Sequence, residues 1–309
     1  MSVMERKLHA RGVRVIATSA VRHEWWLDAA LMRQVAAADL LIINGEGTLH
    51  HGARQGANLL RLADHEVRGG KPLYLINALY QQNPASWGDQ IRKLDGVWAR
   101  DSWSAGELSA LRGAEVGYFA DLTLCDGFVE FPFDRAGMLI GDSVKKGITR
   151  ELAQVSGKTQ ASTLVPTVHR IKSLKGRKGL AAVPRRIYGA IYETVWGMRH
   201  PQFSMAQDEA AYAAVIAKSA LHVTGRFHGA CFSILTKTPF LTLSSNSWKL
   251  EALLADCGLD ADRLVAPGAL AAAVGQRDWD FSAAERANIA RYVAMSVTAS
   301  DAAFDVIAG

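Results

Sequence analysis

Two consecutive strand–loop–helix units in the last third of the chain constrain its fold most strongly. Each unit begins with a short apolar run, passes through a loop and continues as an apolar helix pattern. The predicted strands are residues 221–224 and 238–243, and the predicted helices that follow them are 230–235 and 250–257. Repeated units of this kind build a parallel sheet with helices packed on its faces. The sequence therefore predicts an open α/β domain here.

The first half of the chain shows the same alternation. Strands are predicted at residues 13–17, 39–44, 72–78, 96–99 and 116–119, with helical patterns between them and a link at 126–135. An apolar run at 137–141 opens the second half, and the segment 283–307 is helical in pattern. We therefore predict two Rossmann-like α/β domains, residues 1–130 and 131–309, that face each other across a cleft. The second domain would carry a basic insertion at 170–186.

Length and composition agree with two globular domains. Of the 309 residues, 49% are hydrophobic and 21% are charged, which provides a core and argues against disorder. No apolar run reaches the roughly 18–20 residues that span a bilayer, and residues 1–7 lack the apolar segment of a secretory signal. The three cysteines, Cys125, Cys231 and Cys257, lie far apart and in no metal-ligand spacing. We expect reduced thiols in a cytoplasmic protein.

One segment accounts for the positive charge of the chain. Residues 170–186 contain seven Lys or Arg and no Asp or Glu, and Tyr188, Tyr192 and Trp196 follow them. Such a segment is a solvated loop, a contact with an anionic membrane surface or a grip on an anionic carrier. No nucleic-acid-binding motif accompanies it, so nucleic acid is not an expected partner. The charge suits a cytoplasmic protein that works at the inner face of the membrane.

The loops of the two C-terminal units carry the main candidate site. Arg226 and His228 follow the first strand, and Lys249 follows the second. Because parallel strands end at a common edge, these side chains are expected to face one spot. An arginine fork and a helix N-terminus favour carboxylate or phosphate, and histidine transfers protons near neutral pH. We expect an acidic small molecule as ligand; the alternative is a plain strand-to-helix turn with a solvated arginine.

A glycine-containing turn follows the strand predicted at 39–44. Gly45 and Gly47 flank Glu46, and glycine lets a ligand approach the main chain. A dinucleotide-binding fingerprint would need a third glycine, which is missing. His50 and His51 cluster with Glu46 at the tip, but no third ligand is evident. A metal site is therefore not expected.

A third element, around Arg100 and Asp101, joins a predicted strand to a predicted helix. Asp101 is placed to cap the helix, and Arg100 is placed to hold neighbouring loops. No titrating partner of Arg100 is evident, so the structural role is favoured over ligand binding.

Taken together, these elements resemble the polysaccharide pyruvyl transferase family. The matching pieces are the strand and glycine turn at 38–47, the run Arg100-Asp101-Ser102, the run Arg226-Phe227-His228-Gly229, and the strand that leads from Pro239 to Lys249. The resemblance implies a GT-B-like two-domain fold that binds phosphoenolpyruvate in the interdomain cleft. It places Arg226 and His228 on the donor-binding Arg-x-His positions of the family and makes Phe227, Gly229, Lys249, Gly45, Gly47 and Arg100 candidate substrate contacts.

Two departures from the family pattern stand out. Residues 18–25 replace the Asn/Gly-Asp-rich loop that family members carry after their first strand, so the first domain, expected to bind the acceptor, is abbreviated. Members also carry an arginine after the first strand of the second domain. Here Lys145 or Lys146 would have to supply that charge.

The resemblance implies transfer of a pyruvyl group from phosphoenolpyruvate to a sugar of a cell-surface polysaccharide or its lipid-linked precursor, giving a ketal. His228 would act as acid/base, Arg226 would hold the donor anion, Lys249 would neutralise the departing phosphate and Glu46 would orient or deprotonate the acceptor hydroxyl. No cofactor is required. The alternatives are a GT-B glycosyltransferase that uses a nucleotide sugar and, less favoured, a non-catalytic scaffold in polysaccharide assembly.

Overall fold

The computed structural model describes residues 2–159, 162–166, 190, 193–195, 197–198, 202–206 and 208–309. The basic segment 170–186 lies outside the described residues, so its contact with a membrane stays a prediction. The chain divides into two compact units. The first comprises Met1–Gly127, Ala255–Cys257 and Asn288–Gly309, and the second comprises Phe128–Leu254 and Gly258–Ala287. Within the described part of the chain, no helix is long and apolar enough to cross a membrane.

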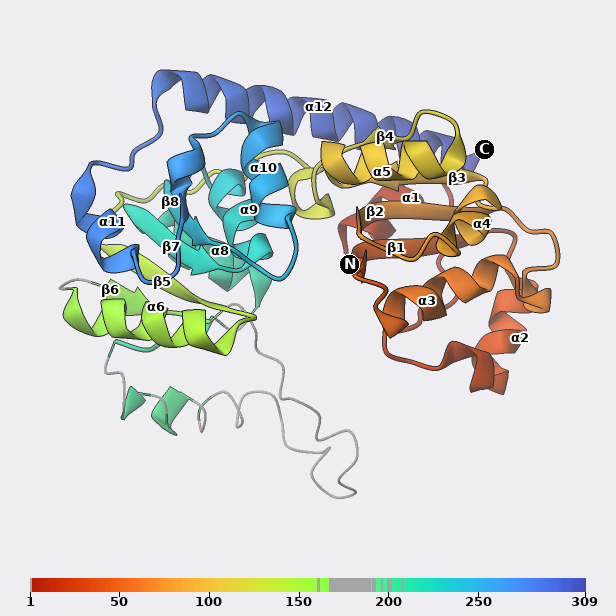
Figure 1. The fold of residues 1–309 in the computed structure, drawn as a ribbon, viewed down its shortest axis with the longest axis horizontal. Coiled ribbons are helices and arrows are strands. Elements are labelled where there is room, and N and C mark those ends of the chain that lie inside the picture. Colours follow the sequence, from red (N-terminus) through yellow and green to blue (C-terminus); the bar gives the residue numbers. More distant parts are fainter. Residues whose placement is uncertain are drawn as a thin grey trace. The chain divides into compact units, whose positions relative to one another are not determined.

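The first unit is built on a four-stranded parallel sheet in the order β1-β2-β3-β4 (Figure 1). Its strands are β1 (Leu41–His50), β2 (Leu73–Gln81), β3 (Gly96–Ala99) and β4 (Gly117–Tyr118). Its α-helices are α1 (Val3–His9), α2 (Ala29–Ala37), α3 (Arg54–Leu60), α4 (Trp87–Arg92) and α5 (Ser102–Arg112), with short 3₁₀ turns η1 (Trp25–Leu27), η2 (Arg61–Ala63), η3 (Glu66–Arg68) and η4 (Leu122–Leu124).

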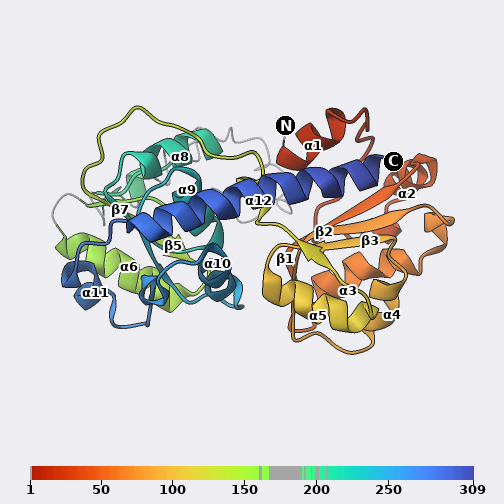
Figure 2. The ribbon, with the colours of Figure 1, turned by 90° about the horizontal axis from the view of Figure 1, so that it is seen from above.

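Apolar side chains cover both faces of this sheet. On one face Leu60 of α3, Ile91 of α4 and Leu108 of α5 pack against the strands. On the other face Leu8 of α1 packs with Phe304 near the end of the C-terminal helix. Figure 2 shows α1 beside that part of the C-terminal helix. The sheet is therefore buried on both sides, as parallel sheets are.

The strand predicted at residues 13–17 is wrong, because no strand forms there. The backbone N–H of Val13 donates instead to the Leu8 carbonyl oxygen at 3.0 Å, which closes the end of α1. Val15 and Ile16 remain 38% and 39% exposed. An apolar run becomes a strand only where a neighbouring strand can pair with it, and this run has none among the described residues.

The second unit contains a five-stranded parallel sheet in the order β6-β5-β7-β8-β9. Its strands are β5 (Met138–Ser143), β6 (Ser162–Leu164), β7 (Leu221–Gly225), β8 (Phe240–Leu243) and β9 (Leu264–Val265). Its helices are α6 (Lys146–Lys158), α8 (Glu209–Ala217), α9 (Phe227–Leu235), α10 (Lys249–Cys257), α11 (Leu270–Gln276) and the turn η5 (Ala261–Arg263). In this order the direction of winding reverses between β5 and β7, and open α/β sheets bind ligands at such a switch point.

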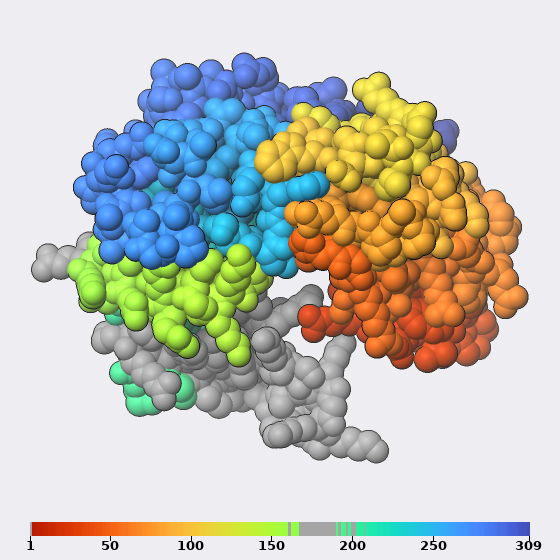
Figure 3. Space-filling view, in the orientation of Figure 1, coloured from red at the N-terminus to blue at the C-terminus, as the bar shows by residue number. Residues whose placement is uncertain are grey.

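Two apolar layers sandwich the second sheet. Leu152 of α6 and Leu270 of α11 belong to one layer, and Tyr212 and Ile216 of α8 belong to the other. The two helices of the first layer are linked by Glu151, whose Oε1 accepts a hydrogen bond from the Gly268 N–H at 2.9 Å. Their surfaces adjoin in Figure 3, where α6 is green and α11 is blue.

The C-terminal helix α12 (Ala283–Ala308) is shared between the two units: its residues up to Ala287 belong to the second unit, and those from Asn288 on belong to the first. Ala303, Phe304 and Ile307 pack in the core of the first unit. Asp301 accepts a hydrogen bond from Lys7 Nζ at 2.9 Å and pairs with Arg11 Nη2 at 3.1 Å. The 26-residue helix therefore has its first residues in the second unit and the rest in the first unit.

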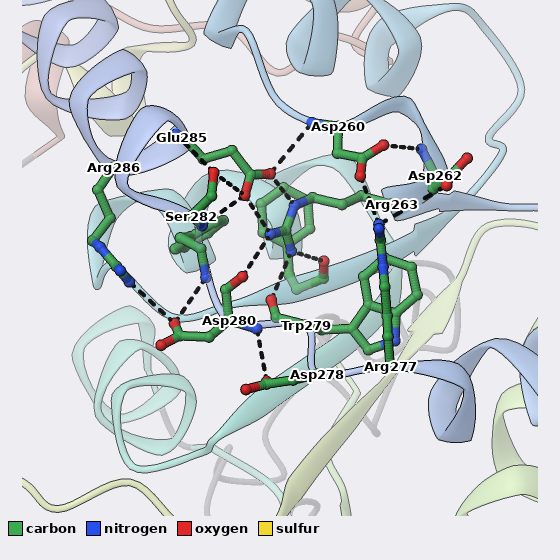
Figure 4. Close-up of polar contacts among 12 residues, drawn as sticks. Asp260, Asp262, Arg263, Arg277, Asp278, Trp279, Asp280, Ser282, Glu285 and Arg286 are labelled. Carbon is green, nitrogen blue, oxygen red and sulfur yellow. Dashed lines mark hydrogen bonds and ion pairs between the residues drawn. The ribbon is translucent and has the colours of Figure 1, made fainter.

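Arg263 fixes the beginning of α12 within the second unit (Figure 4). Its guanidinium is buried and donates to Glu285 Oε1 at 2.7 Å and to Glu285 Oε2 at 3.0 Å. It also donates to the carbonyl oxygens of Phe240 and Trp279 at 3.2 and 3.1 Å. Ser282 and Glu285 form a capping box at the helix start, with both backbone–side-chain bonds present. Because every charged atom has a partner, the burial of this ion pair is compensated.

The Glu285 carboxylate makes stability depend on pH in the acid range. Burial opposes its ionisation, but the hydrogen bonds from Arg263 and the Ser282 N–H outweigh burial and lower the pKa of Glu285 to about 2 from an ordinary 4.5. A depressed pKa gives a stabilisation that is complete above pH 4.5 and is lost as the pH falls towards 2. Glu285→Gln should lower the free energy of unfolding at pH 7 by about 1.5–3 kcal/mol. The difference from the wild type should shrink at pH 3 in denaturant titrations followed by circular dichroism.

Arg286→Gln is the control for this experiment. Arg286 pairs with Asp280 at 3.5 Å on the surface, so its loss should cost less than about 1 kcal/mol. A Glu285→Gln effect that is equal at pH 3 and pH 7 would contradict the ionic origin of the stabilisation.

Candidate functional site

The switch point of the second sheet brings together the ends of β5 and β7. Ser143, the last residue of β5, is the register partner of Gly225, the last residue of β7. Asp142 precedes Ser143, and Arg226 follows Gly225 as the N-cap residue of α9. The carboxyl edge of the sheet therefore places Asp142 and Arg226 side by side, although 84 residues separate them in the sequence.

Arg226 is held in place by two contacts. Its backbone N–H donates to Thr224 Oγ1 at 3.1 Å, and its Nη2 donates to Asp142 Oδ2 at 2.5 Å. The side chains of Arg226 and Asp142 are 21% and 14% exposed, so the pair is largely shielded from water while remaining open on one side. Asp142 fixes the guanidinium at the start of α9, where the helix dipole also favours an anion. The sequence analysis missed Asp142, and its position at the end of a strand was the available signal.

The next residues of α9 have different surroundings. His228 is exposed at the second position of the helix. Phe227 is only 6% exposed, and its ring lies edge-on to the His228 ring with centroids 5.6 Å apart. The Phe227 ring is therefore covered by its surroundings, whereas the His228 side chain is exposed to solvent.

Two glycines of this edge are required by close packing. A Cβ at Gly225 would lie 2.5 Å from Ser143 Cβ, and a Cβ at Gly229 would lie 2.6 Å from Thr224 Oγ1. Both distances are shorter than any ordinary van der Waals contact. Gly225 lets β5 and β7 approach each other, and Gly229 lets α9 lie against β7. The motif glycine Gly229 therefore has a packing reason independent of any ligand.

Two lysines begin helices at the same edge of the sheet. Lys249 is the first residue of α10 after β8, and its Nζ donates to Asn246 Oδ1 at 2.9 Å. Lys145 follows β5, is exposed, and occupies the N-cap position of α6, where its N–H donates to Ser143 Oγ at 3.2 Å. Arg226, Lys249 and Lys145 thus come from the carboxyl ends of three strands of the sheet.

In the first unit, Glu46 lies within a strand rather than in a turn, which corrects the prediction. Strand β1 continues through the glycines to His50, with a register shift against β2 between Glu46 and Leu49. Glu46 has a positive φ of 33°, and Asn77 in the neighbouring strand has a φ of 54°. Asn77 Nδ2 donates to Asn44 Oδ1 at 3.1 Å, and Asn44 Nδ2 donates to Glu46 Oε1 at 3.0 Å. Two asparagines therefore orient the Glu46 carboxylate at the carboxyl edge.

Arg100 has a titrating partner, contrary to the sequence-based expectation. It is 3% exposed, its Nη1 lies 3.8 Å from Asp121 Oδ2, and its backbone N–H donates to the Ala78 carbonyl oxygen at 3.2 Å. A Cβ at Gly47 would lie 3.8 Å from Arg100 Nη2, whereas one at Gly45 would lie 2.8 Å from Ala78 Cα. A Cβ at Gly47 would therefore be in ordinary contact with Arg100, whereas Gly45 is needed for strand packing.

The pair His50 and His51 stack edge to face, with ring centroids 5.1 Å apart. The described residues contain no group of three or more His, Cys, Asp or Glu side chains arranged to hold a metal ion.

Comparison with known proteins identifies the family. The family model of polysaccharide pyruvyl transferase matches residues 4–247. The chain belongs to the polysaccharide pyruvyl transferase family. The resemblance stated from the motifs is thereby confirmed, and so is the prediction of a transferase. No curated protein matches the chain.

Solved structures with a similar fold have very different sequences. The chain is similar to a putative UDP-N-acetylglucosamine 2-epimerase from Listeria monocytogenes, with 12% identity, a TM-score of 0.51, and coverage of 93% of this chain and 80% of the other. It is also similar to the N-terminal domain of trehalose-6-phosphate phosphatase from Candida albicans, with 8% identity, a TM-score of 0.51, and coverage of 99% and 79%. These likenesses concern the fold alone. The predicted class, a GT-B-like pair of Rossmann-like domains, is confirmed.

The close approach of β5 and β7 can be tested with a compensating pair of substitutions. Gly225→Ala should lower the free energy of unfolding by about 1–3 kcal/mol, because the new Cβ forces the two strands apart. Ser143→Gly in the same chain should restore part of the loss, because it removes the atom that the new Cβ meets. Differential scanning calorimetry of the wild type, the single variant and the double variant gives the comparison.

Gly106→Ala is the matched control for Gly225→Ala. A Cβ at Gly106 meets nothing within 4 Å on the exposed side of α5, so this change should stabilise the helix slightly. If Gly225→Ala unfolds at the temperature of the wild type, the close approach does not constrain the sheet.

Proposed function

We propose that this protein transfers a pyruvyl group from phosphoenolpyruvate to two hydroxyl groups of a saccharide, giving a ketal and phosphate. The observation that carries the proposal is the anion site at the switch point of the second sheet. Arg226 lies there at the start of α9, with Lys145 and Lys249 on the adjoining strand ends. Phosphoenolpyruvate carries a carboxylate and a phosphate, which match several cationic groups and a helix N-terminus.

The reaction assigns a role to each group. His228 donates a proton to the methylene carbon, which becomes the methyl group, and C2 becomes cationic. A hydroxyl oxygen of the acceptor bonds to C2, the C2–O bond to phosphate breaks, and a second hydroxyl closes the ketal. Of the two hydroxyl protons, one replaces the proton donated by His228 and the other leaves with phosphate. Lys249 stabilises the departing charge.

Asp142 has a further role in this scheme. Its carboxylate pairs with Arg226 in the structure, so a donor carboxylate must share or replace that pairing. The guanidinium offers five N–H donors, which permits Arg226 to keep Asp142 on one side and bind the donor on another. Asp142 therefore orients Arg226 and at the same time limits donor affinity.

Thermal-shift measurements with different donors test the proposal. Phosphoenolpyruvate at 100 times its dissociation constant should stabilise the protein by about 2.7 kcal/mol. UDP-glucose and GDP-mannose should give no shift, and phosphate or pyruvate alone should give smaller shifts because each presents half of the anion. A shift with a nucleotide sugar and none with phosphoenolpyruvate would instead support a glycosyltransferase.

Substitutions at Arg226 and His228 should separate binding from chemistry. Arg226→Ala should mainly raise the KM for phosphoenolpyruvate, because it removes a charge that pairs with the donor. His228→Ala should mainly lower kcat, by ~10²–10⁴ if the imidazole supplies the proton. Steady-state kinetics that follow phosphate release give both constants. Equal and mild effects of the two substitutions would reduce His228 to a structural residue.

A further inference from the structure

A cavity in the first unit lies apart from the residues discussed so far. It has a volume of about 750 Å³ and is lined by Arg22, His23, Glu24, Leu27, Asp28, Ala29, Arg54, Gln55 and Asn58. This volume falls in the range of small-molecule sites, roughly 300–1,000 Å³. All of its lining residues belong to the first unit.

The cavity lies at the edge of the first sheet where ligands of α/β proteins bind. Its residues come from the start of α2 and the start of α3, and α3 begins at Arg54 soon after β1 ends at His50. Helices that alternate with parallel strands run antiparallel to them, so their first turns lie at the carboxyl ends of the strands. A smaller cavity of about 380 Å³ in the second unit is lined by Leu221 and Pro239, at the amino ends of β7 and β8. Of these two cavities, the first therefore lies at the carboxyl ends of the strands, where α/β proteins bind their ligands.

The wall of the cavity is fastened to the core. Trp25 is buried, and its Nε1 donates to the Asn58 carbonyl oxygen at 3.0 Å. The Trp25 ring also lies edge-on to the His65 ring, with centroids 5.1 Å apart. Asp28 caps α2 by accepting from the N–H groups of Ala30 and Leu31, both at 3.0 Å. These contacts hold the segment 22–28 against α3.

The lining is almost entirely polar. Seven of its nine residues carry hydrogen-bonding side chains, and the two amides, Gln55 and Asn58, each offer donors and an acceptor. Leu27 is 72% exposed and offers an apolar surface beside them. Hydroxyl groups both donate and accept, and sugar rings also present C–H faces, so a saccharide complements this mixture. An apolar ligand would leave the polar groups unsatisfied.

One of the two arginines of the cavity has no carboxylate beside it among the described residues. Arg54 pairs with Glu24 at 2.8 Å, and His23 Nε2 lies 3.4 Å from Asp28. Among the described residues no carboxylate lies within ion-pair distance of Arg22, which is exposed. Arg22 can therefore bind an acidic substituent of the ligand.

We infer that this cavity binds the saccharide acceptor, with Gln55 and Asn58 on its hydroxyl groups and Arg22 on an acidic substituent. The assignment of the saccharide as acceptor rests on the proposed function; the binding of a saccharide does not. The residues that replace the usual family loop at 18–25 thus form part of the wall that recognises the sugar.

Saturation-transfer difference NMR with methyl glycosides of glucose, galactose, mannose, N-acetylglucosamine and glucuronic acid tests the inference. At least one glycoside should bind the wild type, and Gln55→Ala/Asn58→Ala should weaken that binding at least tenfold. The backbone carbonyl that anchors Trp25 is retained in this variant. Gln34→Ala, an exposed glutamine on α2 outside the cavity, should have no effect. Arg22→Ala should weaken the glucuronide more than the neutral glycosides.

Failure of this inference can be told apart from failure of the proposed function. Binding of no glycoside to the wild type, or equal binding by Gln55→Ala/Asn58→Ala and the wild type, would overturn the cavity assignment. In either case the thermal shift with phosphoenolpyruvate can still be present. Conversely, glycoside binding that depends on Gln55 and Asn58 without any phosphoenolpyruvate shift would support a saccharide site and reject the donor.

Discussion

The approach of β5 to β7 at Ser143 and Gly225 is the constraint on which the carboxyl edge of the second sheet depends. The two strands are so close there that no Cβ fits at Gly225. The same approach puts Asp142 within hydrogen-bond distance of Arg226, 84 residues later in the chain. The strand order makes this place the switch point, where neighbouring loops diverge and leave room above the sheet. Packing of the backbone, rather than any single side chain, therefore determines where Asp142 and Arg226 meet.

Two buried arginines show how the fold treats charge in different places. Arg263 is surrounded by the Glu285 carboxylate and two carbonyl oxygens, all at 2.7–3.2 Å, and it fixes the start of α12. Arg100 is equally buried, but its carboxylate partner Asp121 lies 3.8 Å away. Desolvation of a charge is compensated only by close, well-directed contacts. Arg263 meets this requirement and acts as a structural residue, and Arg100 lies at the end of β3, where its backbone N–H donates to the Ala78 carbonyl oxygen at 3.2 Å.

The sequence predicted the features that local interactions determine. Strand 96–99 has the bounds of β3, and Asp101 caps α5 by accepting from the Ser104 N–H at 2.7 Å. The helix at 283–307 was also recognised, because its periodicity is local. Partners across long separations could not be predicted, and Asp142 with Arg226 is the plainest case. For the same reason the sequence did not show that the end of α12 packs on Leu8, or that residues 13–17 lack a pairing strand.

The backbone of the first sheet is strained in two neighbouring strands. Glu46 and Asn77 both adopt positive φ in neighbouring strands, a conformation that costs residues other than glycine of order 1–3 kcal/mol each. Asn77 is 2% exposed, and its Oδ1 has no hydrogen-bond partner among the described residues, which adds a desolvation cost. The chain from Asn77 through Asn44 to Glu46 offsets part of this cost and gives the carboxylate one orientation. A strand that remained regular would need none of these features, but it would point residue 46 along the ordinary alternation of the strand. The distortion therefore has one structural consequence: the Glu46 carboxylate accepts a hydrogen bond from Asn44, which itself accepts one from Asn77.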